Sequence, residues 1–430
     1  MIAGASGEVW RLPSGMRFLE SAAETVATGG ALTLLLEDWV DRNEFVDELR
    51  SHLAVRGLAM QAVRDAEPKA SSPLTCLVDG LGLPETRLRY DVGDDAVTRL
   101  LQLDELPDAT AVIASQDEGL GSDSWINFTQ VWSACSKRLS DGGAIPRALC
   151  VLLPASAVCD RDLPTDAQLA AAWMMGIPDH LEMRIVCRLL DEDESPAAGR
   201  WREHVLPALC GTDLDLLSSL WSAVLEEPEA VLAALDEYAK KRRWGAEELR
   251  TLGVDAFARM QSDVAHDDDG APPSPRLRRA WSSGALTVTA EHGPEVNSAA
   301  LPLLGAQDVL MQRVWRGQVA LVLPAMDGVR MAMCSQLTRS LGPRWATEFS
   351  LPPIEDEARA LQESPLACQW GHMLYLLRHH GRLANYAEWI PLVRLARKLR
   401  NRLAHGSPVS FSRYAAFVDA ARACGFGQWL

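Results

Sequence analysis

The chain has 430 residues, of which 48% are hydrophobic and 23% are charged. This length exceeds what one hydrophobic core usually organises, so we expect two or three domains with the composition of an ordinary globular protein. The formal net charge of −16 argues against a protein that coats nucleic acid with its whole surface. No apolar run is long enough to cross a bilayer, and residues 1–11 do not have the pattern of a secretory signal. We therefore expect a cytoplasmic protein.

The first 160 residues predict an α/β domain. Apolar runs of strand length occur at 31–36, 74–78, 111–114 and 148–153, and helical patterns occur at 15–26 and 125–139. Strands that alternate with helices favour a mostly parallel sheet with helices on its faces.

A nucleotide-binding role for this domain lacks its usual motif. None of the five lysines follows a glycine, so a Walker A loop, GxxxxGK[ST], is excluded. The pairs Glu37-Asp38 and Asp117-Glu118 could form a Walker B motif, but without the phosphate loop we interpret them as solvated strand ends. The order of elements resembles a degenerate P-loop module of the STAND or AAA type. That resemblance implies a sensing or scaffolding role instead of ATP hydrolysis.

Residues 161–262 predict a helical domain, with helices at 166–175, 180–190, 213–225 and 228–242. The segment 263–275, DVAHDDDGAPPSP, has the composition of a linker. It begins a region at 263–304 that contains this linker and one short strand at 285–290. From 305 to 430 the pattern is helical again, which predicts an all-α C-terminal domain.

Nine cysteines are scattered singly along the chain. None forms a CxxC pair, and no histidine spacing completes a zinc site. We interpret them as small buried hydrophobic side chains in a reducing compartment. The sequence predicts no metal and no other cofactor.

The basic residues are concentrated near the C-terminus. Residues 368–430 contain nine basic and two acidic residues, a net charge of +7 in a chain whose total is −16. One interpretation is an arginine-rich helix face that is simply solvated. The other is a local phosphate-binding surface on an otherwise acidic protein.

The segment 392–409, LVRLARKLRNRLAHGSPV, predicts an amphipathic helix near the chain end. Its apolar positions follow the helical spacing of three and four residues: Leu392, Leu395, Ala396, Leu399 and Leu403. Its polar face carries Arg394, Arg397, Lys398, Asn401 and Arg402. Gly406 is the expected helix cap, and Pro408 follows just beyond it.

Within this helix, Arg400, Asn401 and His405 match the R-N-x3-H motif of HEPN ribonucleases. The motif closes a long amphipathic helix, expected at 384–404, and one more helix is expected after it at 411–423.

Two further helices are expected upstream of the motif, at 306–340 and 354–380. With them, residues 305–430 resemble the four-helix bundle of a HEPN domain of the bacterial defence type. Trp315-Arg316-Gly317-Gln318, on the first of these helices, is also similar to sequences in such domains.

The resemblance implies that the domain cleaves RNA without a metal ion. His405 would act as general acid or base, Arg400 would hold the phosphate oxygens, and Asn401 would position the backbone or the imidazole ring. Arg397, Lys398 and Arg402 are the expected further contacts to RNA. In the family two copies of the motif usually meet across a dimer, so a homodimer or a hetero-assembly with other defence proteins is implied.

Two functions remain open after this comparison. The first is a metal-independent endoribonuclease effector of anti-phage or toxin-type defence, regulated by its N-terminal region. The second is a non-catalytic RNA-binding or adaptor subunit of a multiprotein defence complex. A purely structural interpretation also exists, because cations in a last helical turn stabilise the helix dipole. The missing Walker A loop disfavours a third possibility, an ATP-driven regulator.

Overall fold

The computed structural model describes residues 8–37, 40–65, 71–83, 94–114, 120–141, 147–159, 162–191, 195–259, 274–289, 293–348 and 352–430. The chain forms two compact units. Unit 1 contains Met1–Glu182, Gly211–Asp215 and Gly245–Asn297, and unit 2 contains Met183–Cys210, Leu216–Trp244 and Ser298–Leu430. The four-part division expected from the sequence stays a prediction. The expected linker at 263–275 lies outside the described residues, apart from its last two positions.

A five-stranded sheet forms the centre of unit 1. Its strands lie in the order β2-β3-β4-β1-β5, and all neighbouring pairs are parallel. Their bounds are β1 (Gly30–Leu36), β2 (Met60–Asp65), β3 (Ala109–Ala114), β4 (Ala148–Pro154) and β5 (Leu169–Trp173). Every residue of β1 and β4 is buried, as expected for parallel strands that are covered on both faces. The predicted parallel sheet is therefore confirmed.

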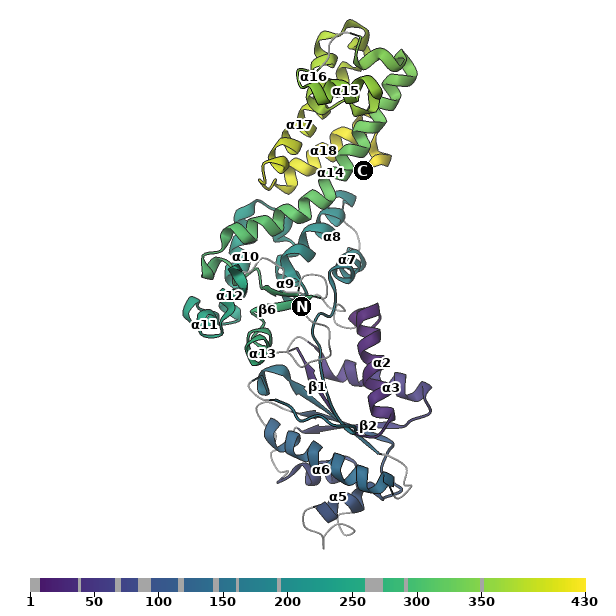
Figure 1. The fold of residues 1–430 in the computed structure, drawn as a ribbon, viewed down its shortest axis with the longest axis vertical. Helices are drawn as coiled ribbons and strands as arrows, with labels where there is room; N and C mark the ends of the chain where they lie inside the picture. Colours follow the sequence, from purple (N-terminus) through teal and green to yellow (C-terminus); the bar gives the residue numbers. More distant parts are fainter. Residues whose placement is uncertain are drawn as a thin grey trace. The chain divides into compact units, whose positions relative to one another are not determined.

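Helices cover both faces of this sheet (Figure 1). One face packs against α2 (Pro13–Ala27) and α3 (Arg42–Val55), and the other against α4 (Pro73–Gly80), α5 (Asp94–Leu101) and α6 (Ser122–Asp141). On the second face, Leu35 and Val151 share a hydrophobic core with Trp125 and Trp132 of α6.

Two sequence predictions in this region are wrong, and one strand has no counterpart among the predictions. The run 74–78 is helical, because Ser72 caps the N-terminus of α4 and Pro73 occupies its first turn. The predicted helix at 166–175 contains β5, where pairing with β1 overrides the helix propensity of an alanine-rich segment. Strand β2 was not predicted, because its six residues include three exposed ones and form no continuous apolar run.

The later segments of unit 1 add three short helices and a hairpin. The helices are α11 (Ala246–Thr251), α12 (Val254–Arg259) and α13 (Pro275–Ser282). The strands β6 (Leu286–Thr289) and β7 (Gly293–Val296) form an antiparallel pair. The strand predicted at 285–290 is confirmed as β6.

The described part of unit 2 is helical. Its first helices are α8 (Pro196–Cys210) and α10 (Pro228–Lys241), while α7 (His180–Leu189) and α9 (Leu214–Leu220) begin in unit 1 and continue into unit 2. They are followed by α14 (Gln307–Leu341), α15 (Glu355–Glu363), α16 (Trp370–His379), the 3-10 segment η7 (Gly381–Trp389), α17 (Ile390–Ala404) and α18 (Phe411–Ala423). The predicted helices at 180–190, 228–242, 306–340 and 411–423 are confirmed, and α14 continues through Pro324.

Two predicted helix boundaries need correction. The helix expected at 354–380 is divided into α15 and α16, because Ser364 is extended and Pro365 begins a separate 3-10 turn. The motif helix begins at Ile390 instead of residue 384, since the preceding residues form η7. Pro391 in the first turn of α17 is compatible with a helix start at this point.

Candidate functional site

The R-N-x3-H motif lies at the C-terminal end of α17. Leu399 and Leu403 are buried on the side of the helix that packs against α14, α16 and α18. His405 is the C-cap residue, and Gly406 adopts the left-handed conformation with a φ of +69°. The N–H of Gly406 donates to the carbonyl of Leu403 (3.1 Å), so the helix ends at the predicted glycine.

The motif side chains are exposed. Within the described residues, the side chains of Arg400, Asn401 and His405 take part in no hydrogen bond or ion pair, so the fold leaves their polar atoms available to a ligand. Arg397 and Lys398 are also exposed on the same helix. Helical spacing places 397, 398, 401 and 405 on one face, with 400 and 402 flanking it.

Arg402 differs from the other cations of the motif segment. Its Nη2 donates to the carbonyl of Pro408 at 3.2 Å, across the turn that follows the helix. A guanidinium has five N–H donors, and this hydrogen bond uses one of them. Its first role in the fold is nevertheless to hold the turn.

Helix α14 supports the end of the motif helix. Trp315 Nε1 donates to the carbonyl of Leu403 at 2.7 Å, and this carbonyl also accepts from the N–H of Gly406. Gln318 is 1% exposed, and its amide group pairs with the backbone of Val409 in both directions. Its Nε2 donates to the Val409 carbonyl, and its Oε1 accepts from the Val409 N–H, each at 2.8 Å. The segment around His405 is thus fixed at Leu403 and at Val409.

Gly317, between Trp315 and Gln318, determines how closely α14 packs against α8. A Cβ atom at this position would lie 2.6 Å from the carbonyl oxygen of His204 in α8, which is closer than real Cβ contacts. The glycine therefore allows α14 and α8 to approach closely. In the sequence, the segment Trp315–Gln318 stood out only by its resemblance to other domains. In the structure, Trp315 and Gln318 form hydrogen bonds to the motif region, and Gly317 allows close packing of α14 on α8.

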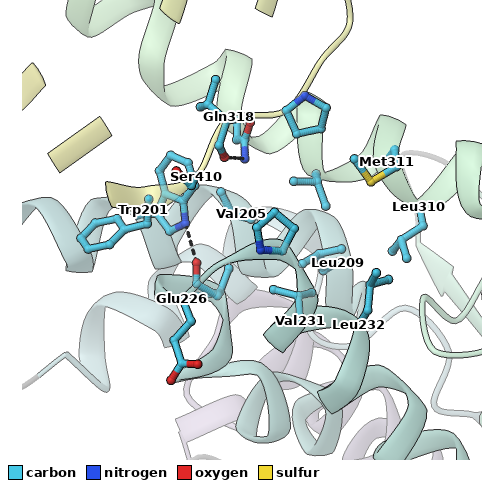
Figure 2. Close-up of a pocket in the computed structure, with 16 residues that line it drawn as sticks. Trp201, Val205, Leu209, Glu226, Val231, Leu232, Leu310, Met311, Gln318 and Ser410 are labelled. Atoms are coloured by element: carbon cyan, nitrogen blue, oxygen red, sulfur yellow. Dashed lines mark hydrogen bonds between the residues drawn. The ribbon is translucent and has the colours of Figure 1, made fainter. Parts of the chain in front are cut away.

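A cavity of about 70 Å³ lies beneath the turn that follows the motif (Figure 2). Its walls come from α8, α10, α14 and the residues Pro408 to Phe411. Val205, Leu209, Val231, Leu310 and Met311 contribute mostly apolar atoms to these walls. Phosphate would lose its hydration in such a space without gaining donors. The exposed cationic face of α17 offers the donors that this cavity lacks.

The other candidate segment follows β1 in unit 1. Asp41 caps α3, and its Oδ1 accepts hydrogen bonds from the N–H groups of Asn43 (2.8 Å) and Glu44 (3.4 Å). A helix N-terminus in this place can bind phosphate, but here it presents a carboxylate. Glu37 accepts a hydrogen bond from Trp281 Nε1 at 3.0 Å. The remaining Walker B candidates, Asp38, Asp117 and Glu118, lie outside the described residues.

Most cysteines are buried in the described chain, as expected from their scattered positions. Seven of the nine are buried, and Cys159 and Cys424 are partly exposed. Burial raises the pKa of Cys150 to about 12 and that of Cys187 to about 12, which disfavours their thiolate forms. Among the described residues, no group of three or more His, Cys, Asp or Glu side chains could hold a metal ion.

None of the helices described is long and apolar enough to cross a membrane. No protein-family model matches the chain, and comparison with curated proteins finds no match.

Proposed function

We propose that the chain is a metal-independent endoribonuclease of the HEPN type, with its active site at the end of α17. The observation that carries this proposal is the contrast between a fixed backbone and unpartnered side chains at the end of α17. The backbone on both sides of His405 is held by Trp315 and Gln318, while Arg400, Asn401 and His405 are exposed and take no partner among the described residues. A rigid backbone that presents unused polar groups is what a catalytic site requires.

The chemistry follows from RNA itself. The 2′-oxygen attacks the adjacent phosphorus, the bond to the 5′-oxygen breaks, and the products carry a 2′,3′-cyclic phosphate and a 5′-hydroxyl. One proton must leave the 2′-hydroxyl and one must reach the 5′-oxygen, and His405 provides one of these transfers. The Arg400 guanidinium can form two parallel hydrogen bonds to the phosphate oxygens and stabilise their charge as it develops. No step requires a metal ion.

A second copy of the chain would complete the site. A catalytic histidine is usually oriented by a partner group, and no described residue donates to or accepts from the His405 ring. A second motif across a two-fold interface would bring another Arg400, Asn401 and His405 to the same phosphate. A homodimer, or a pair with another HEPN protein, is therefore part of the proposal.

RNA cleavage by the purified full-length protein in EDTA tests this function. Wild type should shorten RNA, and the Arg400→Ala and His405→Ala variants should not. Arg413→Ala, an exposed arginine on α18 outside the motif, is the matched control and should cleave normally. Equal cleavage by wild type and both motif variants would disprove the assignment of the site.

The biological setting is proposed to be bacterial defence in the cytoplasm, where RNA cleavage stops growth or blocks a phage. Unit 1 would then sense a cue or bind a partner as a degenerate P-loop-like module. Its parallel sheet and the carboxylate cap of Asp41 at the loop after β1 support a role without phosphate binding. Expression of wild type in cells should be toxic, and His405→Ala should remove the toxicity.

The second candidate is a non-catalytic RNA-binding or adaptor subunit of a defence complex. The bond between Arg402 and Pro408, and the lack of an orienting group for His405 among the described residues, favour this reading. Such a protein would bind RNA with a steep salt dependence and never shorten it. RNA binding without cleavage at any protein concentration would select it over the nuclease.

A further inference from the structure

Helix α16 carries a row of three ring side chains. His372, Tyr375 and His379 are spaced by three and four residues and therefore lie on one side of the helix. The ring centroids of His372 and Tyr375 are 6.3 Å apart with an angle of 21° between the planes, and those of Tyr375 and His379 are 4.9 Å apart at 44°. The core takes up the opposite side of α16 through Trp370, Met373, Leu374, Leu376 and Leu377.

Tyr375 and His379 are exposed, and His372 is partly buried and fixed in orientation. Tyr375, at the centre of the row, is 44% exposed. His372 Nε2 lies 3.1 Å from the carbonyl oxygen of Ala346, which can only accept, so Nε2 carries a proton and donates it. Because the ring of His372 is already held in place, it loses little conformational freedom when a ligand ring stacks on the row.

The row adjoins the cationic face of α17. A Cβ atom at Gly371 would lie 4.0 Å from Nε of Arg397, so this arginine rests against the first turn of α16. The segment η7 joins the end of α16 to the start of α17, and the proximity of Gly371, at the start of α16, to Arg397, halfway along α17, is that of an antiparallel pair. Measured from the contact between Gly371 and Arg397, Tyr375 lies about 6 Å further along the axis of α16. His405 lies about 12 Å from the same contact along α17, in the opposite direction.

The surface between these two points suits a nucleic acid strand. From Trp370 to His405 the chain has one acidic residue, Glu388, against seven arginine and lysine residues, of which Arg382 is paired with Glu348 at 2.6 Å. Cations along the path can bind successive phosphates, while the rings offer flat apolar faces. A base-paired duplex hides the faces of its bases, whereas an unpaired base can turn out and stack on an aromatic side chain.

We propose that His372, Tyr375 and His379 form a stacking surface for an unpaired base of the RNA, a few nucleotides from the phosphate held at the motif. The RNA is therefore single-stranded along this path. This inference rests on the proposed function, because it assigns a binding subsite to the same substrate. Tyr375 is the central contact, and Arg397 connects the subsite to the motif.

Cleavage kinetics with full-length protein and unpaired RNA of two lengths test the subsite. Tyr375→Ala should raise KM for a long unpaired oligonucleotide about tenfold, the effect of losing one base–aromatic stack, and leave kcat unchanged. A dinucleotide reaches only the motif, so its cleavage should not change. Tyr375→Phe keeps the ring and should behave as wild type. Trp429→Ala, which removes another exposed aromatic side chain (50% exposed), is the matched control.

Binding of the same RNAs to the His405→Ala chain separates this inference from the proposed function. If wild type does not cleave but Tyr375→Ala weakens binding of unpaired RNA, the nuclease fails and the subsite stands. If wild type cleaves and Tyr375→Ala leaves KM for the long RNA unchanged, the subsite is wrong and the nuclease stands. Equal affinity for unpaired and fully paired RNA, or no RNA binding at all, also overturns the subsite.

Discussion

The loop after β1 and the end of α17 both present polar side chains at a helix terminus, but their polar atoms are used differently. At the start of α3, the Asp41 carboxylate binds the N–H groups of Asn43 and Glu44. At the end of α17, the side chains of Arg400 and His405 have no partner among the described residues, while Trp315 from α14 donates to the Leu403 carbonyl. The side chain at the first terminus is used by its own helix. At the second, the N–H of Gly406 and Trp315 Nε1 bind the Leu403 carbonyl, and the side chains of Arg400 and His405 are left to a ligand.

This difference separates a structural from a functional interpretation of the same residue type. A cation near a helix C-terminus stabilises the helix dipole whether or not it binds RNA. Arg402, which holds the turn through Pro408, fits the structural interpretation. Arg400, without such a contact, fits the functional one. Substitution of Arg400 should therefore affect cleavage without affecting stability, and substitution of Arg402 should affect stability with only a small effect on cleavage.

The largest effect is expected from Arg400→Ala compared with Arg402→Ala. Loss of the phosphate contact in the transition state should lower kcat for RNA cleavage by about a hundredfold or more in Arg400→Ala, with the melting temperature unchanged. Arg402→Ala should lower the melting temperature slightly and cleavage only a few-fold. RNA cleavage assays and thermal melts of both variants check this. A larger cleavage defect in Arg402→Ala would reverse our assignment.

The next largest effect is expected at Gln318, whose side chain holds the backbone of Val409 behind the motif. Gln318→Ala leaves the buried N–H and carbonyl of Val409 without partners, and each lost partner costs about 1–3 kcal/mol. We expect the free energy of unfolding to fall by about 3 kcal/mol in urea titrations, together with a loss of cleavage. Gln312→Ala, an exposed glutamine on the same helix, is the control and should change neither. A stable Gln318→Ala protein would show that the pairing does not hold the turn.

The motif helix could be predicted because its information is local. Leu399 and Leu403 repeat at helical spacing, and Gly406 provides the left-handed residue that ends the helix. The start of the helix was misplaced, because the residues of η7 have the composition of a helix but adopt 3-10 turns. Periodicity alone does not distinguish these two helix types.

The support of the site could not be predicted, because it depends on residues that are distant in the sequence. Gln318 and Val409 are 91 positions apart, and neither position has a pattern that points to the other. In the same way, β5 was missed because its strand conformation comes from pairing with β1 and not from its own residues. The row on α16 has helical spacing that is visible in the sequence, but only the structure shows that it is exposed and beside Arg397.

A smaller effect is expected at the contact between α14 and α8. In Gly317→Ala the added Cβ would meet the backbone of His204, and backbone cannot move aside as a flexible side chain can. Overpacking of this kind costs about 2 kcal/mol and should shift α14 together with Trp315 and Gln318. Urea unfolding and the KM of cleavage should both change. Ala320→Gly, at an exposed position of the same helix, controls for a helix-propensity change and should affect stability alone.

The smallest effect is expected at the other helix terminus. Asp41→Ala removes the cap of α3 and should lower the free energy of unfolding by about 1 kcal/mol, because two N–H groups lose their acceptor. It should leave RNA cleavage unchanged. Equilibrium dialysis with ATP adds a stricter test, since removing the carboxylate exposes a helix N-terminus that could accept phosphate. ATP binding by wild type would show that the Asp41 carboxylate does not prevent phosphate binding at the N-terminus of α3. It would contradict our interpretation of this terminus as purely structural.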